Sequence, residues 1–221
     1  MPNICMCIPL IVEKLCTCFY NQAMQYIQEE IAAVAARMVV EEGLEYGTAK
    51  RRAVKHLGLP ARTALPDNDT LETQVRDYIE LFCADTQPQE LRTLRELAVL
   101  WMHRLAPYRP YLGGAVWHGT ATKLSDIYLQ LFCDDTKALE IELVNRGQQY
   151  TPASVRGLHG KTVDTLSLHC KCVGLDTTVG VHLMMNDYDD VRGSLHADSQ
   201  GRRPRGNVQA VMQLLSKDSG I

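Results

Sequence analysis

Residue types that can handle phosphate and a divalent cation are concentrated in one stretch, GGAVWHGTATKLSDIYLQLF, which runs from Gly113 to Phe132. Its small residues, Gly114 and Gly119 among them, would let backbone N–H groups approach a phosphate closely. Asp126 opens an alternating segment and offers a carboxylate, an oxygen ligand of the kind that Mg²⁺ prefers. The stretch therefore predicts a site for a phosphorylated ligand and a metal ion, centred on Asp126.

Two further acids, Glu140 and Glu142, lie in the segment LEIELV (139–144). Their alternation with apolar residues predicts a strand that carries both carboxylates on one face. If that strand neighbours 125–132, the two acids could join Asp126 around one metal ion. We predict Asp126, Glu142 and Glu140 as catalytic acids, with Asp126 and Glu142 as the metal ligands. Alternating acids that simply face water are the alternative.

The cysteines admit two interpretations. Four of the eight are crowded near the N-terminus: Cys5, Cys7, Cys16 and Cys18. Four thiolates could close a zinc site, but the absence of a hairpin pattern around them favours an appended segment without that role. The segment HCKC (169–172), with Cys133 and His182, could likewise bind metal, whereas burial in a sheet is the interpretation we favour. No secretory signal is recognisable, so we expect a cytoplasmic protein with free thiols.

Periodicity divides the chain into a helical half and a strand-rich half. Apolar residues at helical spacing predict four helices, at 24–42, 48–57, 71–83 and 89–105. Asp69 or Thr70 is the expected N-cap of the third helix. The buried stripe of the fourth helix is predicted to comprise Leu91, Leu94, Leu97, Ala98, Trp101 and Leu105.

After Pro107 and Pro110 the pattern favours strands, at 125–132, 139–144, 162–172 and 178–187, before a last helix at 207–216. This order predicts an α+β fold, a helical subdomain packed on a small mixed or antiparallel sheet. The expected divisions are a poorly ordered extension (1–23), the helical subdomain (24–107), the α+β domain (108–200) and a basic loop with the C-terminal helix (201–221). The loop, GRRPRG, could contact phosphate, although such a run is usually solvated.

The central stretch resembles the nucleotidyltransferase fold, whose common form reads FGSRARGTA…SDIDL. The positions that match are Gly114, Gly119, Thr120, Ala121, Ser125, Asp126, Ile127 and Leu129. The resemblance implies a nucleoside triphosphate bound with Mg²⁺ or Mn²⁺ and transfer of a nucleotidyl group. It also implies cofactor-binding roles at Gly114, Ala115, His118, Gly119, Thr120 and Ser125. The chain is similar as well to a group of uncharacterised bacterial proteins with this core.

Departures from that pattern put the transfer reaction in question. Ala115 stands where the family has serine, and Tyr128 stands where it has the second metal-binding acid. A neutral phenol, with a pKa near ~10, is a poor magnesium ligand. Two hypotheses follow: an active nucleotidyltransferase, or a catalytically silent module that binds a nucleotide or, through its helices, a protein. The loss of the second acid favours the silent module.

Two aromatic side chains in the same stretch, His118 and Trp117, each have more than one possible role. His118 could contact a phosphate or transfer a proton near neutral pH, or simply be solvated. Trp117 could stack on a base, but we favour a role as an anchor for the turn.

A third hypothesis comes from GLHGKT (157–162), which is similar to the ATP loop of UDP-N-acetylmuramate–alanine ligase and related murein ligases. Its glycines, Lys161 and Thr162 could cradle phosphate and magnesium. Such a loop needs a buried strand before it and a helix after it, whereas residues 162–172 have the pattern of a strand. We therefore expect a tight hairpin connection and treat the ligase as a distant alternative.

Composition excludes several other classes. The net charge of −3 gives no reason to expect attraction to nucleic acid or to anionic membranes. Aromatic residues are 6% of the chain, too few for a base-stacking platform to be its main purpose. No apolar run approaches the ~20 residues that span a bilayer. The partner we expect is therefore a nucleotide, or a protein docked on the helical subdomain.

Overall fold

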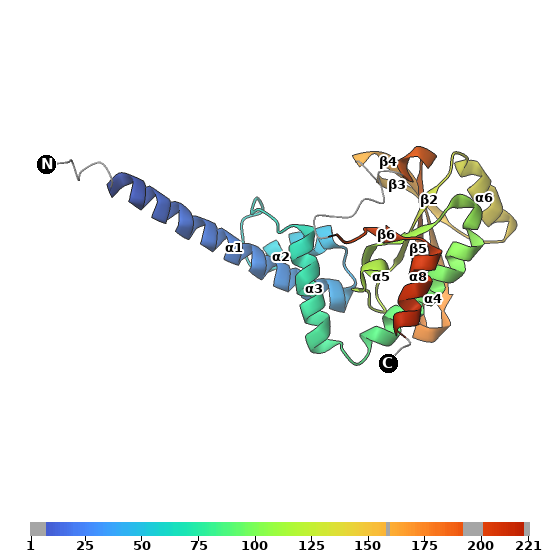
Figure 1. Cartoon of the computed structure of the whole chain (residues 1–221), viewed down its shortest axis with the longest axis horizontal. Helices are drawn as coiled ribbons and strands as arrows, with labels where there is room; N and C mark the ends of the chain where they lie inside the picture. The colour runs from blue at the N-terminus through green and yellow to red at the C-terminus, as the bar shows by residue number, and fades with distance from the viewer. Residues whose placement is uncertain (1–7, 158–159, 192–200, 219–221) are drawn as a thin grey trace. The chain divides into compact units, whose positions relative to one another are not determined.

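A computed structural model describes residues 8–157, 160–191 and 201–218 of the chain. Contacts divide it into two compact units, Met1–Glu80 and Leu81–Ile221, which are described separately below. Figure 1 labels the elements of both units along the chain.

The first unit contains three helices, α1 (Ile8–Glu42), α2 (Tyr46–His56) and α3 (Asn68–Phe82), the last of which runs past its boundary. α1 begins at Ile8, earlier than the predicted start at Met24. The expectation of a poorly ordered extension over residues 1–23 stays a prediction. Apart from Pro9 in the first turn, where proline is tolerated, α1 contains no glycine or proline that would stop it. Gly43, with a positive φ of 68°, ends the helix as predicted.

Polar contacts hold α2 and α3 together in this unit. The ammonium group of Lys50 is buried and donates to the carbonyl of Pro66 and to Oδ1 of Asn68, both at 2.7 Å. Asp67, rather than Asp69 or Thr70, caps α3: its Oδ1 accepts from the N–H of Thr70 at 2.7 Å. This hydrogen bond lowers the pKa of Asp67.

The second unit is built on a six-stranded sheet in the order β3-β4-β5-β2-β1-β6. The strands are β1 (Tyr111–Gly113), β2 (Ile127–Phe132), β3 (Thr151–Arg156), β4 (Thr162–Cys172), β5 (Thr177–Asn186) and β6 (Arg205–Gly206). All neighbours are antiparallel except β2 and β5, which are parallel. The predicted α+β class with a mixed sheet is therefore confirmed.

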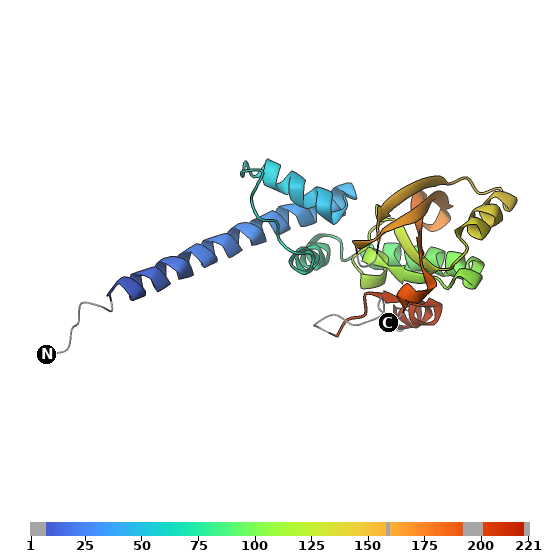
Figure 2. The same cartoon turned by 90° about the horizontal axis from the view of Figure 1, so that it is seen from above.

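Among the described residues, four α-helices accompany the sheet: α4 (Gln87–Arg104), α5 (Gly114–His118), α6 (Thr136–Asn145) and α8 (Val208–Asp218). α4 and α8 lie side by side, in green and red in Figures 1 and 2, and contact β2 and β1 respectively. The predicted stripe of α4 is buried, with Leu97 only partly so. Although the sequence places this helix with the helical subdomain, its contacts make it part of the second unit.

The predicted strand LEIELV is wrong, because these residues form the middle of helix α6. Asp135 caps the helix, its Oδ1 accepting from the N–H of Ala138 at 3.0 Å. Leu139 and Leu143, one turn apart, are buried in the core, whereas Ile141 between them is 60% exposed. The burial period is therefore that of a helix, and the acidic residues on either side of Ile141 do not line a sheet.

Candidate functional site

Strand alternation gives the sheet one buried face and one partly exposed, more polar face, which we call the open face. In β2, Ile127, Leu129 and Leu131 are fully buried, so Tyr128 and Gln130 point the other way. The strand registers place one residue from each strand in a row across this open face: Thr151, Ser167, His182, Tyr128, Gly113 and Arg205. The candidate site is built from this row and from Asp126, the residue before β2.

Asp126 is held by two donors from β5. Its Oδ1 accepts from the N–H of Gly180 at 2.9 Å, and its Oδ2 lies 3.1 Å from Nε2 of His182. The hydrogen bond from His182 is the main cause of a lowered pKa for Asp126, so this carboxyl is ionised at neutral pH. A carboxylate only accepts, so Nε2 of His182 must carry the hydrogen.

Gly180 makes this arrangement possible. A Cβ at residue 180 would lie 2.6 Å from the carboxyl carbon of Asp126, closer than any real side chain is found. The glycine therefore lets the carboxylate reach the backbone of β5.

An aromatic pair occupies the position of the second acid. The ring of Tyr128 stacks on the imidazole of His182, with centroids 4.7 Å apart and planes inclined by 23°. Gly114 follows β1 with a positive φ of 67°, and a Cβ there would lie 3.6 Å from the Tyr128 ring. The ring of Tyr128 thus fills the space between His182 and Gly114.

A hydroxyl extends this arrangement on the other side of His182. Ser167, opposite His182 in β4, has its Oγ 2.9 Å from Nδ1 of that ring. Because Nε2 carries the hydrogen, Nδ1 of the neutral ring accepts, and the hydroxyl of Ser167 donates. A polar cavity of ≈ 530 Å³ adjoins Ser167. Its lining residues are Gln148, Gln149, Tyr150, Thr151, Ser167 and His169.

Glu140 and Glu142 do not join Asp126. On helix α6, Glu142 accepts from the hydroxyl of Tyr108 at 2.8 Å and from Arg146 at 2.6 Å, and Glu140 lies 3.4 Å from the hydroxyl of Tyr150. Burial, with the neighbouring carboxylate of Glu142, raises the pKa of Tyr108 to about 12. Among the described residues, no three His, Cys, Asp or Glu side chains are grouped as metal ligands. The predicted three-acid cluster is wrong because its second element is a helix.

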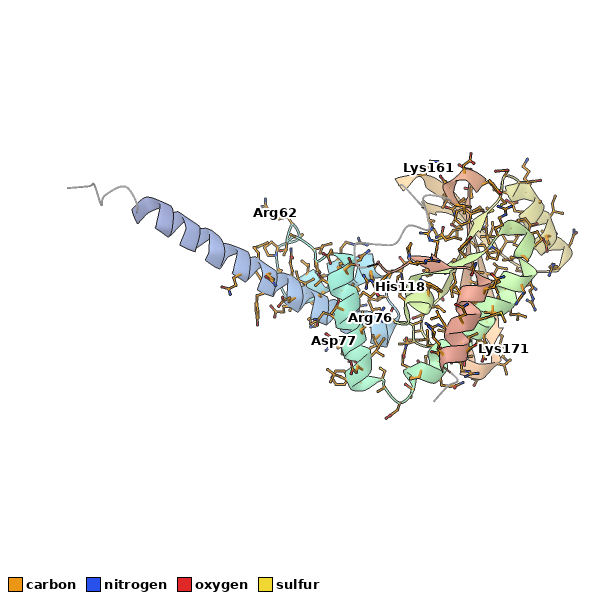
Figure 3. All side chains as sticks on the ribbon, in the orientation of Figure 1. Arg62, Arg76, Asp77, His118, Lys161 and Lys171 are labelled. Atoms are coloured by element: carbon orange, nitrogen blue, oxygen red, sulfur yellow. The ribbon has the colours of Figure 1, made fainter. Side chains whose placement is uncertain are left out.

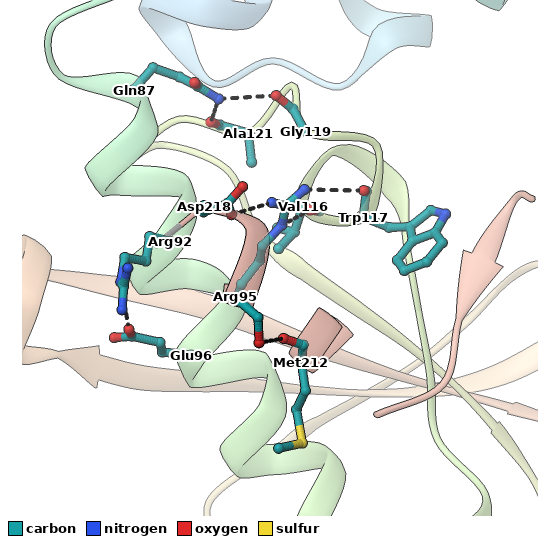
Figure 4. A network of polar contacts seen from close by, with 11 residues as sticks. Gln87, Arg92, Arg95, Glu96, Val116, Trp117, Gly119, Ala121, Met212 and Asp218 are labelled. Atoms are coloured by element: carbon teal, nitrogen blue, oxygen red, sulfur yellow. Dashed lines mark hydrogen bonds and ion pairs between the residues drawn. The ribbon is translucent and has the colours of Figure 1, made fainter. Parts of the chain in front are cut away.

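Contacts from α4 support the loop after β1 (Figure 4). Gln87 donates to the carbonyls of Gly119 and Ala121 at 3.0 and 2.9 Å. The buried guanidinium of Arg95 donates to the carbonyl of Val116 at 3.2 Å and pairs with Asp218 at 2.7 Å. These contacts fix the backbone that carries the predicted phosphate-binding residues.

Several residues of the family pattern have local structural roles. Ser125 accepts through its Oγ from the N–H of Thr122 at 3.0 Å, which closes the turn before β2. Thr120 is buried, Ala115 packs against the core, and the backbone of Gly114 is exposed. His118 is partly buried on α5 and is labelled in Figure 3. Cofactor binding by these residues stays a prediction.

Trp117 anchors the basic segment to α5. Its Nε1 donates to the carbonyl of Arg203 at 2.7 Å, and its ring lies over Gly206, where a Cβ would come within 2.2 Å of it. This places Arg205 beside Gly113 on the open face. Nη1 of Arg205 is buried without a hydrogen-bond partner in the described structure, and burial lowers the pKa of this side chain. In the sequence, the basic run GRRPRG (201–206) is the signal that points to Arg205.

The ligase hypothesis fails on the local structure of GLHGKT. Gly157 donates its N–H to the carbonyl of Lys161 at 2.7 Å, and the antiparallel strands β3 and β4 flank the turn, so the predicted hairpin is confirmed. Leu158 and His159 lie outside the described residues. Lys161 is at one end of β4, opposite Lys171 (Figure 3), and its ammonium lies 3.4 Å from Asp190. A strand rather than a helix follows the lysine, so the loop is not a phosphate cradle of the P-loop kind.

The cysteines of the sheet are partly or fully buried, as the favoured interpretation expects. Cys172 is buried, and burial raises the pKa of Cys170 and of Cys133. The zinc interpretation of the N-terminal cysteines concerns side chains outside the described part of the chain.

Among the described residues, no helix has the length and apolar character that crossing a membrane requires.

Comparisons with known proteins found similarity at the level of solved structures. No family model and no curated protein matches the chain. The solved structures include the Cid1 poly(U) polymerase with MgGTP bound (15% identity, TM-score 0.33), covering 50% of this chain and 37% of that one. They also include a cytoplasmic RNA terminal U-transferase (18%, TM-score 0.32, covering 54% and 38%) and Cid1 with the UTP analogue UMPNPP (13%, TM-score 0.32, covering 67% and 41%). The chain thus spans about two fifths of the length of these structures.

Proposed function

We propose that the unit Leu81–Ile221 is a nucleotidyltransferase-type domain that binds a nucleoside triphosphate on its open sheet face and has lost two-metal nucleotidyl transfer. The resemblance of the segment 114–129 supports the type, and the order β1, α5, β2 agrees with the strand, turn and strand that this resemblance implies. The observation that carries the proposed loss of transfer is the stack of Tyr128 on His182, which fills the place of the second carboxylate.

The side chains around Asp126 do not provide suitable ligands for two Mg²⁺ or Mn²⁺ ions. Both carboxylate oxygens of Asp126 already accept hydrogen bonds, from Gly180 and His182. The nearest partners on β2 and β5 are a phenol and an imidazole, whereas Mg²⁺ and Mn²⁺ prefer oxygen ligands with negative charge. The residues therefore favour a nucleotide bound without tight metal coordination, and no step of a transfer reaction is assigned to them.

Arg205 supplies a positive charge for the phosphates in place of metal. Among the described residues, the buried Nη1 of its guanidinium has no hydrogen-bond partner, and a buried donor of this kind calls for an acceptor. Gly113 pairs with Arg205, and the next residue, Gly114, presents exposed backbone without a side chain. A guanidinium matches the geometry of phosphate oxygens, and exposed backbone allows the close approach of a polyphosphate.

Thermal unfolding in the presence of ATP, GTP, CTP or UTP tests this proposal, first with EDTA and then with Mg²⁺ or Mn²⁺. We expect at least one nucleotide to raise the melting temperature in EDTA, because a ligand that binds only the folded state stabilises it. The variant Arg205→Ala should abolish the shift. The matched control is Arg203→Ala, which removes the same charge from an exposed position of the same segment and should preserve the shift.

Two results would overturn the proposal. If no nucleotide at millimolar concentration shifts the wild-type melting temperature, the domain does not bind nucleotides. If the wild type releases pyrophosphate from a nucleotide in a metal-dependent reaction that Asp126→Asn abolishes, transfer chemistry has been retained.

A further inference from the structure

We infer that Ser167, His182 and Asp126 form a nucleophile relay that hydrolyses small polar esters bound in the cavity beside Ser167. The inference goes beyond nucleotide binding. It rests on the contacts between strands β4, β5 and β2 and on the position of that cavity.

The three side chains form one continuous hydrogen-bonded chain. The hydroxyl of Ser167 donates to Nδ1 of His182 over 2.9 Å, and Nε2 of the same ring donates to Oδ2 of Asp126 over 3.1 Å. A hydroxyl, an imidazole and a carboxylate in this order are the parts from which unrelated folds build an activated serine, and the arrangement is recognised by geometry and roles. Here the two ring nitrogens have exchanged the roles that they have in serine proteases.

The relay is held rigidly by the sheet. Ser167 and His182 are direct partners in the antiparallel pair of β4 and β5, and Asp126 is fixed on its far side by the N–H of Gly180. The ring of Tyr128 stacks on His182 and restricts its rotation. The carboxylate of Asp126 accepts from Nε2 of His182, which leaves Nδ1 to accept from Ser167. Asp126 acts through His182 and is a positioning residue.

The cavity gives Ser167 access to a ligand, and among the lining residues Ser167 is the one whose hydroxyl contacts His182. It adjoins Ser167 directly, so a ligand there could contact the hydroxyl. The cavity of ≈ 530 Å³ lies within the usual range for small-molecule sites, about 300–1,000 Å³. Its lining of amides, hydroxyls, a phenol and an imidazole suits an uncharged ester rich in oxygen. The amide groups of Gln148 and Gln149 can donate to the oxyanion that forms during attack.

The reaction requires only water as a second substrate. Oγ of Ser167 attacks the ester carbonyl carbon and passes its proton to Nδ1 of His182, giving a tetrahedral oxyanion. As the bond from carbon to the leaving oxygen breaks, the proton moves from Nδ1 to the departing alcohol, and an acyl group remains on Ser167. Water then attacks this acyl group, His182 accepts the proton of the water and returns it to Oγ, and the carboxylic acid leaves.

The full chain is tested with a fluorophosphonate probe and with p-nitrophenyl acetate. We expect one probe adduct per chain, located on Ser167 by peptide mass spectrometry, and a burst of p-nitrophenolate. Ser167→Ala should remove both, and His182→Gln should lower the labelling rate by about 10²–10⁴-fold, the usual contribution of a general base. The matched control is Ser154→Ala on β3, whose hydroxyl pairs with Asp164; it should label like the wild type.

The Asp126→Asn variant is tested with a measurement that would not change if Asp126 had only a structural role. With the wrong tautomer of His182, the labelling rate should fall and its dependence on pH should change, while the far-UV circular dichroism stays that of the wild type. A wild type that is not labelled, that is labelled at another residue, or that is labelled equally in His182→Gln would overturn the inference. If a variant loses its native circular dichroism spectrum, Ser167→Cys is tested in its place with an alkylating ester probe. Failure of the thiol at residue 167 to react would also overturn the inference.

Failure here can be told apart from failure of nucleotide binding in a single wild-type sample. Nucleotide-induced stabilisation without labelling of Ser167 would reject the relay alone. Labelling without nucleotide-induced stabilisation would reject the nucleotide site alone.

Discussion

Tyr128 and His182 stack face to face with ring centroids 4.7 Å apart, across the parallel pair of β2 and β5. In the nucleotidyltransferase pattern that this chain resembles, the position of Tyr128 carries the second metal-binding acid. The stack therefore places an aromatic side chain at that position and supports the imidazole that donates to Oδ2 of Asp126.

Tyr128→Asp is expected to rebuild metal binding. Two carboxylates two positions apart, at 126 and 128, would bring negative charge and oxygen ligands together on one face, which is the requirement for Mg²⁺ or Mn²⁺. Calorimetric titration with Mn²⁺ should detect binding in the variant and none in the wild type. Tyr128→Phe is the matched control, because it removes the hydroxyl but keeps the stack and adds no ligand. Equal Mn²⁺ affinity in Tyr128→Asp and Tyr128→Phe would contradict this account of the lost site.

Gly180→Ala is expected to destabilise the protein by about 1–3 kcal/mol, the usual cost of forcing a methyl group into an occupied position. The added Cβ would meet the Asp126 carboxyl at 2.6 Å and displace it from both of its donors. The free energy of unfolding in urea measures the cost. Gly47→Ala is the control, because a Cβ there meets nothing closer than 3.6 Å within helix α2. A Gly180→Ala variant as stable as the wild type would mean that Asp126 is not held as described.

The contribution of Asp126 to stability should depend on pH. Its pKa in the folded protein lies below the ordinary value for an aspartate side chain, chiefly because of the hydrogen bond from His182 and despite the opposing effect of burial. The ionised carboxylate therefore stabilises the fold above the unfolded pKa, and this contribution disappears as the pH falls through the lowered folded pKa. His182 and His169 are the basic side chains that lie near it. Urea unfolding of wild type and Asp126→Asn should differ at neutral pH and converge at the acidic end, whereas a constant difference would argue against a lowered pKa.

Asp135→Ala is expected to cost about 1 kcal/mol, the typical loss for an N-cap. Oδ1 of Asp135 accepts from the N–H of Ala138, which otherwise has no partner within the first turn of α6. Asp134→Ala removes an equal charge from the neighbouring exposed position and should be nearly neutral. The comparison is made by urea unfolding, and equal losses in the two variants would indicate a general charge effect instead of a cap.

Most of the described helices, and the strands β2, β4 and β5, could be predicted because their patterns are long or unambiguous, whereas β1, β3 and β6 are absent from the prediction. The stripe of α4 and the alternation of β2 repeat several times, and both periods appear in the burial of the folded chain. The segment 139–144 was too short to decide. An apolar spacing that includes Leu139, Ile141 and Leu143 fits a strand, whereas the spacing of Leu139 and Leu143 alone fits a helix. The N-cap at Asp135, which favours the helix, is not among the sequence predictions.

The sequence by itself determined that an acid, a glycine turn and an open strand face occur together between Gly114 and Tyr128, because local spacing dictates those relations. Only the tertiary structure decided what surrounds Asp126. The parallel pairing of β2 with β5 joins segments more than fifty residues apart, and its register brings Gly180 and His182 to the carboxylate. One residue of slip would turn His182 to the other face of the sheet, away from Asp126 and Ser167. Register depends on packing of the whole core, and for that reason the partners of Asp126 could not be obtained from the spacing of residues along the chain.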